Sequence, residues 1–333
     1  MKNMSIYTHS HQHQIGFTLI ELMISLVLGL IVSAAVIQVY LINVKTSSIQ
    51  ASASELQDAS VFGLQQLEKK IRVANLGNPV TQLTDKTVNG GIVLMGTNLG
   101  ITATPYSGAG YLTRRAGDTV STKPGWTGIS NTADIGSDQL TIQYRNITGT
   151  NMDDCEGNIV APNDIAIERY FLRESTDNIY PGAIKNLVLA CDAGRIDPTQ
   201  ADGIKKITPT TDLRNFGQAG QEFIVNVDQF KVLLGTQSTS ASTAGQLMFM
   251  PSSAYLKITD DKLKPAIMAV KIGLIVHGST PVIGSNDQDT FTVLNQELKL
   301  KADVSRKKQV RNTYESTTLL RNARVVNVST SLQ

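Results

Sequence analysis

The sequence has little net charge, few aromatic residues and few histidines and cysteines. These shortages limit both the functions and the fold that it can have. Thirty Lys and Arg against 28 Asp and Glu leave 333 residues with a net charge of only +2, so no broad positive field exists to bind nucleic acid nonspecifically. Aromatic residues make up 5% of the chain, while Gly, Ser, Thr and Asn are scattered widely, which favours turns and short strands. Because 41% of residues are still apolar, we expect a folded, β-rich protein.

The sequence also offers little of the chemistry that an enzyme needs. Three of the four histidines lie within the first 13 residues, and His277 follows an apolar segment, which predicts a surface residue at a strand end. Ser305 and Lys308 form a lone Ser-x-x-Lys pattern without its companion motifs. We therefore expect no enzyme activity, no catalytic residue, no cofactor and no metal site.

One basic cluster lies near the C-terminus. It contains Asp303 and no aromatic residue that could stack on bases, so we predict a solvated loop or strand edge and no direct nucleic-acid partner. Its members are Lys299, Lys301, Arg306, Lys307, Lys308 and Arg311.

The apolar residues are concentrated in one N-terminal segment. Residues 22–44 are 23 consecutive residues without Asp, Glu, Lys or Arg, enough for a helix to cross a hydrocarbon core of about 30 Å. The next most apolar stretch, residues 265–277, is too short and carries Lys271. We expect a single, N-terminal membrane span.

Three kinds of N-terminal segment fit such a span: a cleaved secretory signal, a permanent anchor, or a segment that is retained after a short leader is removed. Ser33, Ala34 and Ala35 could provide an ordinary cleavage site. Against an ordinary signal, Lys2 is the only fixed positive charge before the apolar segment, and Glu21 would cost about 2–3 kcal/mol at membrane depth. The carboxylate needs a partner.

The residues around Glu21 resemble the processing and methylation signal of type IV prepilins. They read Gly16-Phe17-Thr18-Leu19-Ile20-Glu21-Leu22-Met23, with Gly, Phe and Glu at the spacing of that signal. The resemblance implies a leader of residues 1–16, cleavage between Gly16 and Phe17 by a membrane-embedded prepilin peptidase, and methylation of the new Phe17 amine. The leader departs from the pattern because it contains few Lys or Arg, so positive-inside orientation is weakly encoded.

Glu21 is predicted to act in assembly rather than catalysis. In a bundle of staggered identical helices, its carboxylate can pair with the Phe17 amine of a neighbouring subunit and so set the axial register between them. The alternative is a Glu21 side chain that reaches the lipid headgroups.

Residues 17–44 are predicted to form the transmembrane or filament-core helix, and residues 45–76 an amphipathic continuation. Asn75, Gly77 and Pro79 supply the stop signals. The apolar stripe of the continuation has helical spacing and consists of Ile49, Ala53, Leu56, Gly63, Leu67, Ile71 and Ala74.

Residues 77–333 are predicted to form a β-rich globular head. The first part, to residue 135, is dense in turn residues and should hold loops with short strands. Alternating apolar residues then predict strands at 140–145, 165–172, 187–191, 223–227, 230–234, 247–250, 267–276, 291–300 and 317–328. The expected fold is α+β, type IV pilin-like, with the long N-terminal helix packed on one antiparallel β-sheet.

Three segments of the head resemble the PilW-type minor pilins, which are related to the J-type pseudopilins of type II secretion. They are residues 227–235, the strand at 267–276 and residues 314–322. The resemblance implies a minor pilin that helps to build the tip or priming complex, with twitching, adhesion and DNA uptake depending on it indirectly. Its alternative is a type II secretion pseudopilin.

The resemblance also implies partners and a location. The partners would be other minor pilins, the major pilin, the large tip adhesin, the prepilin peptidase, the inner-membrane assembly platform and membrane lipid. The chain would sit in the inner membrane with its head in the periplasm, and later in a surface pilus.

Cys155 and Cys191 are the only two cysteines. If the head lies outside the cytoplasm, a pair predicts one disulfide, which would close a loop of about 36 residues and stabilise the fold by about 3–4 kcal/mol. Two free thiols are the alternative, and two isolated cysteines make a poor metal site.

Overall fold

The computed structural model describes residues 16–57, 62–100, 111–118, 126–176, 182–197, 204–205, 216–237, 245–260, 263–282, 288–303 and 308–323, with the backbone alone at 204–205. The chain divides into two compact units, one up to Ser48 and one from Ile49 onward. The predicted leader lies outside the described residues, except for Gly16.

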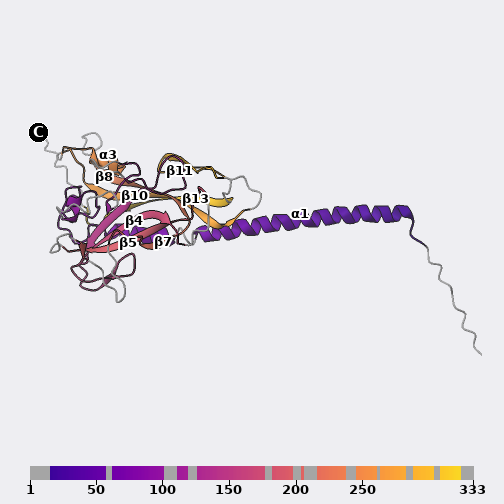
Figure 1. The fold of residues 1–333 in the computed structure, drawn as a ribbon, viewed down its shortest axis with the longest axis horizontal. Coiled ribbons are helices and arrows are strands. Elements are labelled where there is room, and N and C mark those ends of the chain that lie inside the picture. The colour runs from indigo at the N-terminus through magenta and orange to yellow at the C-terminus, as the bar shows by residue number, and fades with distance from the viewer. Residues whose placement is uncertain are drawn as a thin grey trace, which may run out of the picture. The chain divides into compact units, whose positions relative to one another are not determined.

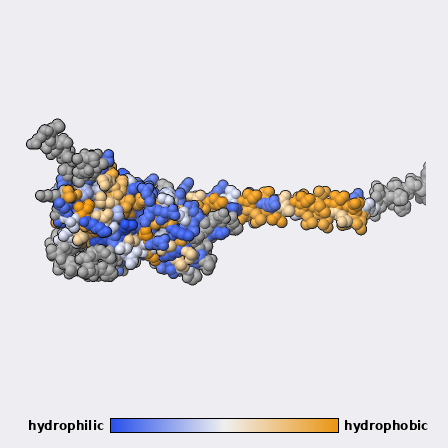
Figure 2. Space-filling model, turned by 90° about the horizontal axis from the view of Figure 1, so that it is seen from above, coloured by the Kyte–Doolittle hydropathy of each residue, from blue (hydrophilic) through white to orange (hydrophobic). Residues whose placement is uncertain are grey.

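The first unit is formed by helix α1 (Leu19–Gln57), which continues into the second unit. Every large apolar side chain of α1 from Leu19 to Ile42 is more than half exposed, as the orange surface of this helix shows (Figure 2). Among the described residues, α1 is the one helix long and apolar enough to cross a membrane. Its apolar surface therefore needs lipid or other helices to cover it.

The second unit, the head, is α+β, as predicted (Figure 1). Helices are few after residue 80, and most described elements are strands. In chain order the elements after α1 are α2 (Gly63–Val73), the 3₁₀ helix η2 (Gly96–Leu99), β1 (Leu140–Arg145), β2 (Met152–Asp153), β3 (Ile159–Val160), β4 (Ile165–Glu174), β5 (Leu187–Ile196), β6 (Ile204–Lys205), β7 (Gln221–Ile224), β8 (Val227–Gln237), β9 (Leu247–Met250), α3 (Ser252–Leu256), β10 (Ile267–Pro281), β11 (Thr290–Val293), β12 (Gln296–Lys299) and β13 (Gln309–Leu319).

The strands form two main antiparallel sheets rather than the one that we expected. The first has the order β1-β4-β5-β6, with β7 also paired to β5, and the second has the order β13-β10-β8-β9. Two hairpins, β2-β3 and β11-β12, form separate two-stranded sheets that pack against these two sheets.

Both sheets share one core with the helices. Leu67 and Ile71 of α2 are fully buried in the same apolar cluster as Leu189 of the first sheet and Leu274 of the second. The predicted amphipathic stripe is confirmed where the helix meets this core, because Leu56, Leu67, Ile71 and Ala74 are all buried.

Helix α2 ends where the stop signals predict. Asn75 (φ 67°) and Gly77 (φ 72°) both adopt the left-handed conformation that ends a helix. Asn75 is fully buried, and its side-chain oxygen accepts a hydrogen bond from the Gly91 backbone N–H at 3.0 Å. The turn thereby ties the end of the helix to the first loop of the head.

Three predicted strands have different limits in the structure, because a turn divides or ends each of them. The pattern at 223–227 is divided between β7 and β8 because Asn226 has φ 58°. The segment 291–300 is a hairpin, with Leu294 (φ 51°) and Asn295 (φ 61°) in its two-residue turn. The last strand, β13, begins at Gln309 and ends at Leu319, so it covers only the start of the predicted 317–328 strand, whose residues from 324 lie outside the described part.

Candidate processing and assembly site

The predicted cleavage site lies immediately before α1. Gly16, Phe17 and Thr18 are non-helical, and the Phe17 side chain is 90% exposed. A Cβ built on Gly16 would meet no other atom within 4 Å, so the fold itself does not require glycine at this position. A requirement for glycine would therefore come from a partner that binds the backbone closely, as a peptidase does.

Glu21 caps the helix that it belongs to. Its Oε2 accepts hydrogen bonds from the Thr18 backbone N–H at 3.0 Å and from the Thr18 hydroxyl at 2.9 Å, while the Thr18 hydroxyl oxygen accepts one from the Glu21 N–H at 3.3 Å. This reciprocal pair is a capping box, which satisfies backbone donors at the start of the helix. The Thr-x-x-Glu spacing of Thr18 and Glu21 is the signal in the sequence from which this capping box could have been predicted.

The last turns of α1 are joined to the C-terminal end of β10. Ser52 is fully buried against Gly278, where a Cβ would collide with the Ser52 hydroxyl. Glu55 accepts hydrogen bonds from the Ser279 N–H at 2.9 Å, the Ser279 hydroxyl at 2.7 Å and the Thr280 hydroxyl at 3.1 Å. This contact holds the helix end on the second sheet.

The helix contact predicts a pH dependence. The hydrogen bond from the Ser279 hydroxyl lowers the pKa of Glu55 below its ordinary value of 4.5, even though partial burial opposes the shift. A lowered pKa in the folded state adds stability above pH 4.5, and this contribution is lost as pH falls through the folded pKa. We expect Glu55→Gln to make thermal stability less dependent on pH below about 4.5. An acid limb as steep as that of the wild type in pH-dependent thermal melts would contradict this role.

Helix α2 is joined to both sheets by polar side chains. Glu68 accepts a hydrogen bond from the Ser316 hydroxyl of β13. On the other side, the Lys70 ammonium donates to the Asp153 carbonyl at 2.6 Å and lies 3.4 Å from the Glu168 carboxylate of β4. Lys70 thus connects the helix to the first sheet.

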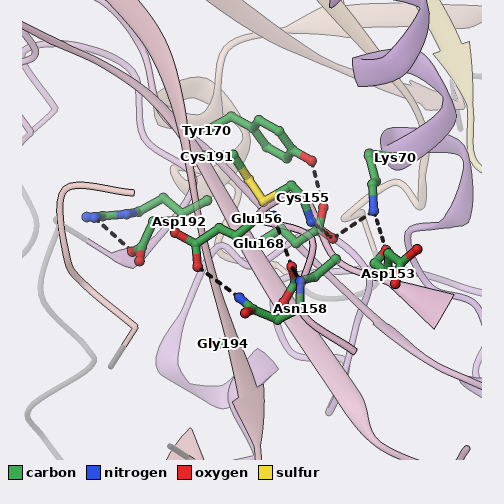
Figure 3. Close-up of a disulfide and its surroundings, with 12 residues drawn as sticks. Lys70, Asp153, Cys155, Glu156, Asn158, Glu168, Tyr170, Cys191, Asp192 and Gly194 are labelled. Carbon is green, nitrogen blue, oxygen red and sulfur yellow. Dashed lines mark hydrogen bonds and ion pairs between the residues drawn. A yellow bond between two sulfur atoms is a disulfide. The ribbon is translucent and has the colours of Figure 1, made fainter. Parts of the chain in front are cut away.

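The two cysteines are joined by a disulfide beside this lysine (Figure 3). Cys191 lies on β5 and Cys155 in the loop between β2 and β3, with Cα atoms 6.1 Å apart. The Cys155 N–H donates to Glu168 at 3.1 Å, so the cross-linked loop also provides a donor to the buried carboxylate.

Glu168 is fully buried but well satisfied. Besides Lys70 and Cys155, it accepts hydrogen bonds from the hydroxyls of Tyr144 at 2.9 Å and Tyr170 at 2.6 Å. Burial, with the neighbouring carboxylate, raises the pKa of Tyr170 well above its ordinary value, so the phenol remains a donor. The cluster is built to hold the loop, the helix and the first sheet together.

The same cluster is the one group in the described part of the chain with the spacing of metal ligands: Cys155, Glu168 and Cys191. The disulfide occupies both sulfur atoms, and Glu168 already accepts the hydrogen bonds described above. In this oxidised form the cluster offers no thiolate ligand.

The structure corrects the prediction for His277. It lies inside β10 rather than at its end and is only 5% exposed, with its Nε2 3.8 Å from the Asp228 carboxylate. Its Nδ1 lies 3.0 Å from the Gly278 carbonyl oxygen.

The basic cluster is dispersed rather than a single solvated edge. The Arg311 guanidinium is buried and donates to Asp228 at 2.8 Å, and Lys301 donates to the Ser130 carbonyl at 2.7 Å. Lys299 is exposed as predicted, and its side chain lies near Asp289. Ser305, Arg306 and Lys307 lie outside the described residues.

Two protein-family models match the chain, one near its N-terminus and one in its C-terminal part. Residues 11–37 match the family model of the prokaryotic N-terminal methylation motif, and residues 199–322 match that of the type IV pilus-assembly protein W. No functionally curated protein matches the chain.

A solved structure, a type IV-like pilin from Thermus thermophilus, is similar at 12% identity over 80% of this chain and 96% of that chain, with a TM-score of 0.36. The chain is similar to the type IV pilus-assembly protein W family over residues 199–322, and its N-terminus matches the prepilin methylation motif.

Proposed function

We propose that the chain is a minor pilin, made as a prepilin and processed between Gly16 and Phe17. Removal of residues 1–16 leaves a Phe17 amine that is then methylated. Residues 17–44 first span the inner membrane and then enter the filament core, residues 45–76 join this segment to the head, and residues 77–333 form the head in the periplasm.

One observation supports this proposal above all: the prepilin motif leads directly into a helix whose apolar surface is exposed to residue 42. A single span would cover that surface with lipid, and a bundle of such helices would cover it with neighbouring subunits. The head offers a second surface for neighbours. The protein would then act by packing against neighbouring subunits rather than by catalysis.

Glu21 supports the same proposal. Its Oε2 is used in the helix cap, whereas no contact with Oε1 is seen among the described residues. The carboxylate can therefore cap its own helix and also accept a neighbour's Phe17 amine. Such a pair would neutralise two charges in an apolar filament core and fix the stagger between subunits.

The finer role that we propose is in starting the filament. The PilW match supports a subunit of the priming or tip complex, in contact with other minor pilins, the major pilin and the large tip adhesin. Twitching, adhesion and DNA uptake would depend on it indirectly, through the number of pili. A pseudopilin of type II secretion is the second candidate, because it would use the same N-terminal motif and helix.

Substitution of Gly16 tests processing and assembly together. We expect Gly16→Val to leave the chain at full length on an immunoblot, retained in the membrane fraction and absent from sheared surface pili, because the added side chain obstructs the peptidase. The wild-type chain should be shorter by the mass of the leader and present in the pilus fraction. Normal processing of Gly16→Val would contradict the assigned cleavage site, and a processed chain that never enters pili would contradict the proposed function.

A further inference from the structure

The head contains a pocket of about 480 Å³ between the 114–118 turn and the end of α3. Three of its lining side chains are cationic, Arg114, Arg115 and Lys257, and one is acidic, Asp118. The other described residues of the wall are Ala116, Gly117, Ser253 and Leu256. This pocket plays no part in processing or in the helix contacts.

Arg114 is buried at the wall of this pocket, and two of its three guanidinium nitrogens make no hydrogen bond to the described residues. Its Nη1 donates to the carbonyls of Leu94 at 2.7 Å and Thr113 at 2.9 Å. Its Nε and Nη2 are buried and have no hydrogen-bond partner in the part of the chain that the structure describes. These two nitrogens form the side-on edge of the guanidinium, whose parallel N–H groups match the two oxygens of a carboxylate or phosphate.

The charge of Arg114 is poorly compensated. Burial lowers the pKa of Arg114 to about 10. The negative charge of Asp118 raises this pKa but offsets only part of the effect of burial. Asp118 is itself engaged elsewhere, because its Oδ2 accepts hydrogen bonds from the Arg115 N–H at 3.0 Å and the Ser252 hydroxyl at 3.2 Å. A buried cation without an anionic partner is costly, and an anion that entered the pocket would relieve that cost.

The other two cations reinforce this site. In the described part of the chain, no ion pair joins the side chain of Arg115 or Lys257 to an acid. Three cations against one acid give the pocket a positive potential that attracts oxyanions.

We propose that this pocket binds an oxyanion, the carboxylate or phosphate group of a ligand, on the side-on edge of Arg114 with Arg115 and Lys257 completing the charge. Solvent does not reach the two free nitrogens, so a wall side chain moves aside when the oxyanion binds. The site belongs to the head and is independent of whether the chain enters a pilus or a pseudopilus.

The single tryptophan provides a local probe of the site. The Trp126 carbonyl accepts a hydrogen bond from the N–H of Gly117, a residue of the pocket wall, at 2.8 Å. The purified full chain in detergent would be titrated with inorganic phosphate and separately with acetate, at constant ionic strength set with sodium chloride. We expect a saturable change in Trp126 fluorescence and a rise in the midpoint of thermal unfolding.

Matched variants separate this site from a general salt effect. Lys257→Gln should weaken phosphate or acetate binding by about tenfold, since it removes one charged hydrogen-bond donor. Lys299→Gln removes an exposed cation that does not line the pocket and should leave the affinity unchanged. Arg114→Lys keeps the charge without the side-on edge and should abolish binding, provided that its thermal melt shows a folded chain.

The ligand titrations also identify the source of the oxyanion. Saturation by phosphate alone assigns a phosphate group, and saturation by both probes assigns carboxylates as well. Absence of a saturable signal with either probe, or equal affinity in Lys257→Gln and the wild type, would overturn the proposal. None of these outcomes depends on piliation, so they are distinct from failure of the proposed function.

Discussion

Glu21→Val is expected to remove the chain from pili while leaving its processing intact. The valine suits an apolar helix core, but the Phe17 amine of the neighbouring subunit would lose its counter-charge there. An uncompensated buried charge costs about 3–5 kcal/mol, which corresponds to subunit contacts at least about a hundredfold weaker. Immunoblots of sheared pili and of membranes should show mature-length chain in the membranes and almost none in the pili.

Glu21→Gln is the matched control for this experiment. The amide oxygen of glutamine can still accept the hydrogen bonds that Glu21 receives from Thr18, so the helix cap is kept while the charge is lost. If charge pairing sets the register, both variants fail to enter pili. Normal incorporation of Glu21→Gln would reduce Glu21 to a capping residue, and normal incorporation of Glu21→Val would remove it from assembly altogether.

Loss of the disulfide is expected to have the largest effect on stability. The Cys155–Cys191 bond spans a sequence separation of 36 residues, for which the chain-entropy argument gives about 3–4 kcal/mol. The Cys155→Ala, Cys191→Ala double variant also leaves the loop that donates to Glu168 less constrained. We expect the thermal midpoint of the purified chain to fall by roughly 10 °C.

A reducing agent provides the control for that loss. Dithiothreitol should lower the midpoint of the wild type toward that of the double variant and leave the double variant unchanged. A midpoint that is the same in all four samples would show that the cross-link adds nothing to the folded head.

Local patterns in the sequence were enough to predict the features of the N-terminal region. The prepilin motif, the apolar helix and the stripe at Leu67 and Ile71 each depend on residues a few positions apart, and the family match and burial confirm them. Strand β9 was predicted with its observed limits for the same reason.

Turns and long-range pairs were harder to predict. The hairpin turn at Leu294 and Asn295 needs positive φ at both positions, and leucine is a poor signal for that conformation. Arg311 looked like one member of a solvated basic cluster because its partner, Asp228, lies 83 residues away in the sequence. The same distance in sequence concealed the burial of His277, which faces Asp228 from β10. The two-sheet architecture likewise depends on contacts that alternation within a strand does not encode.

The central claim, that this chain builds pili, is tested most directly by a clean deletion. Surface pili would be counted by electron microscopy, and type II exoprotein secretion would be measured in the same strain, with the gene restored in trans as the control. The account predicts a loss or sharp reduction of pili with secretion intact. Intact pili with lost secretion would contradict it and assign the chain to a type II pseudopilus.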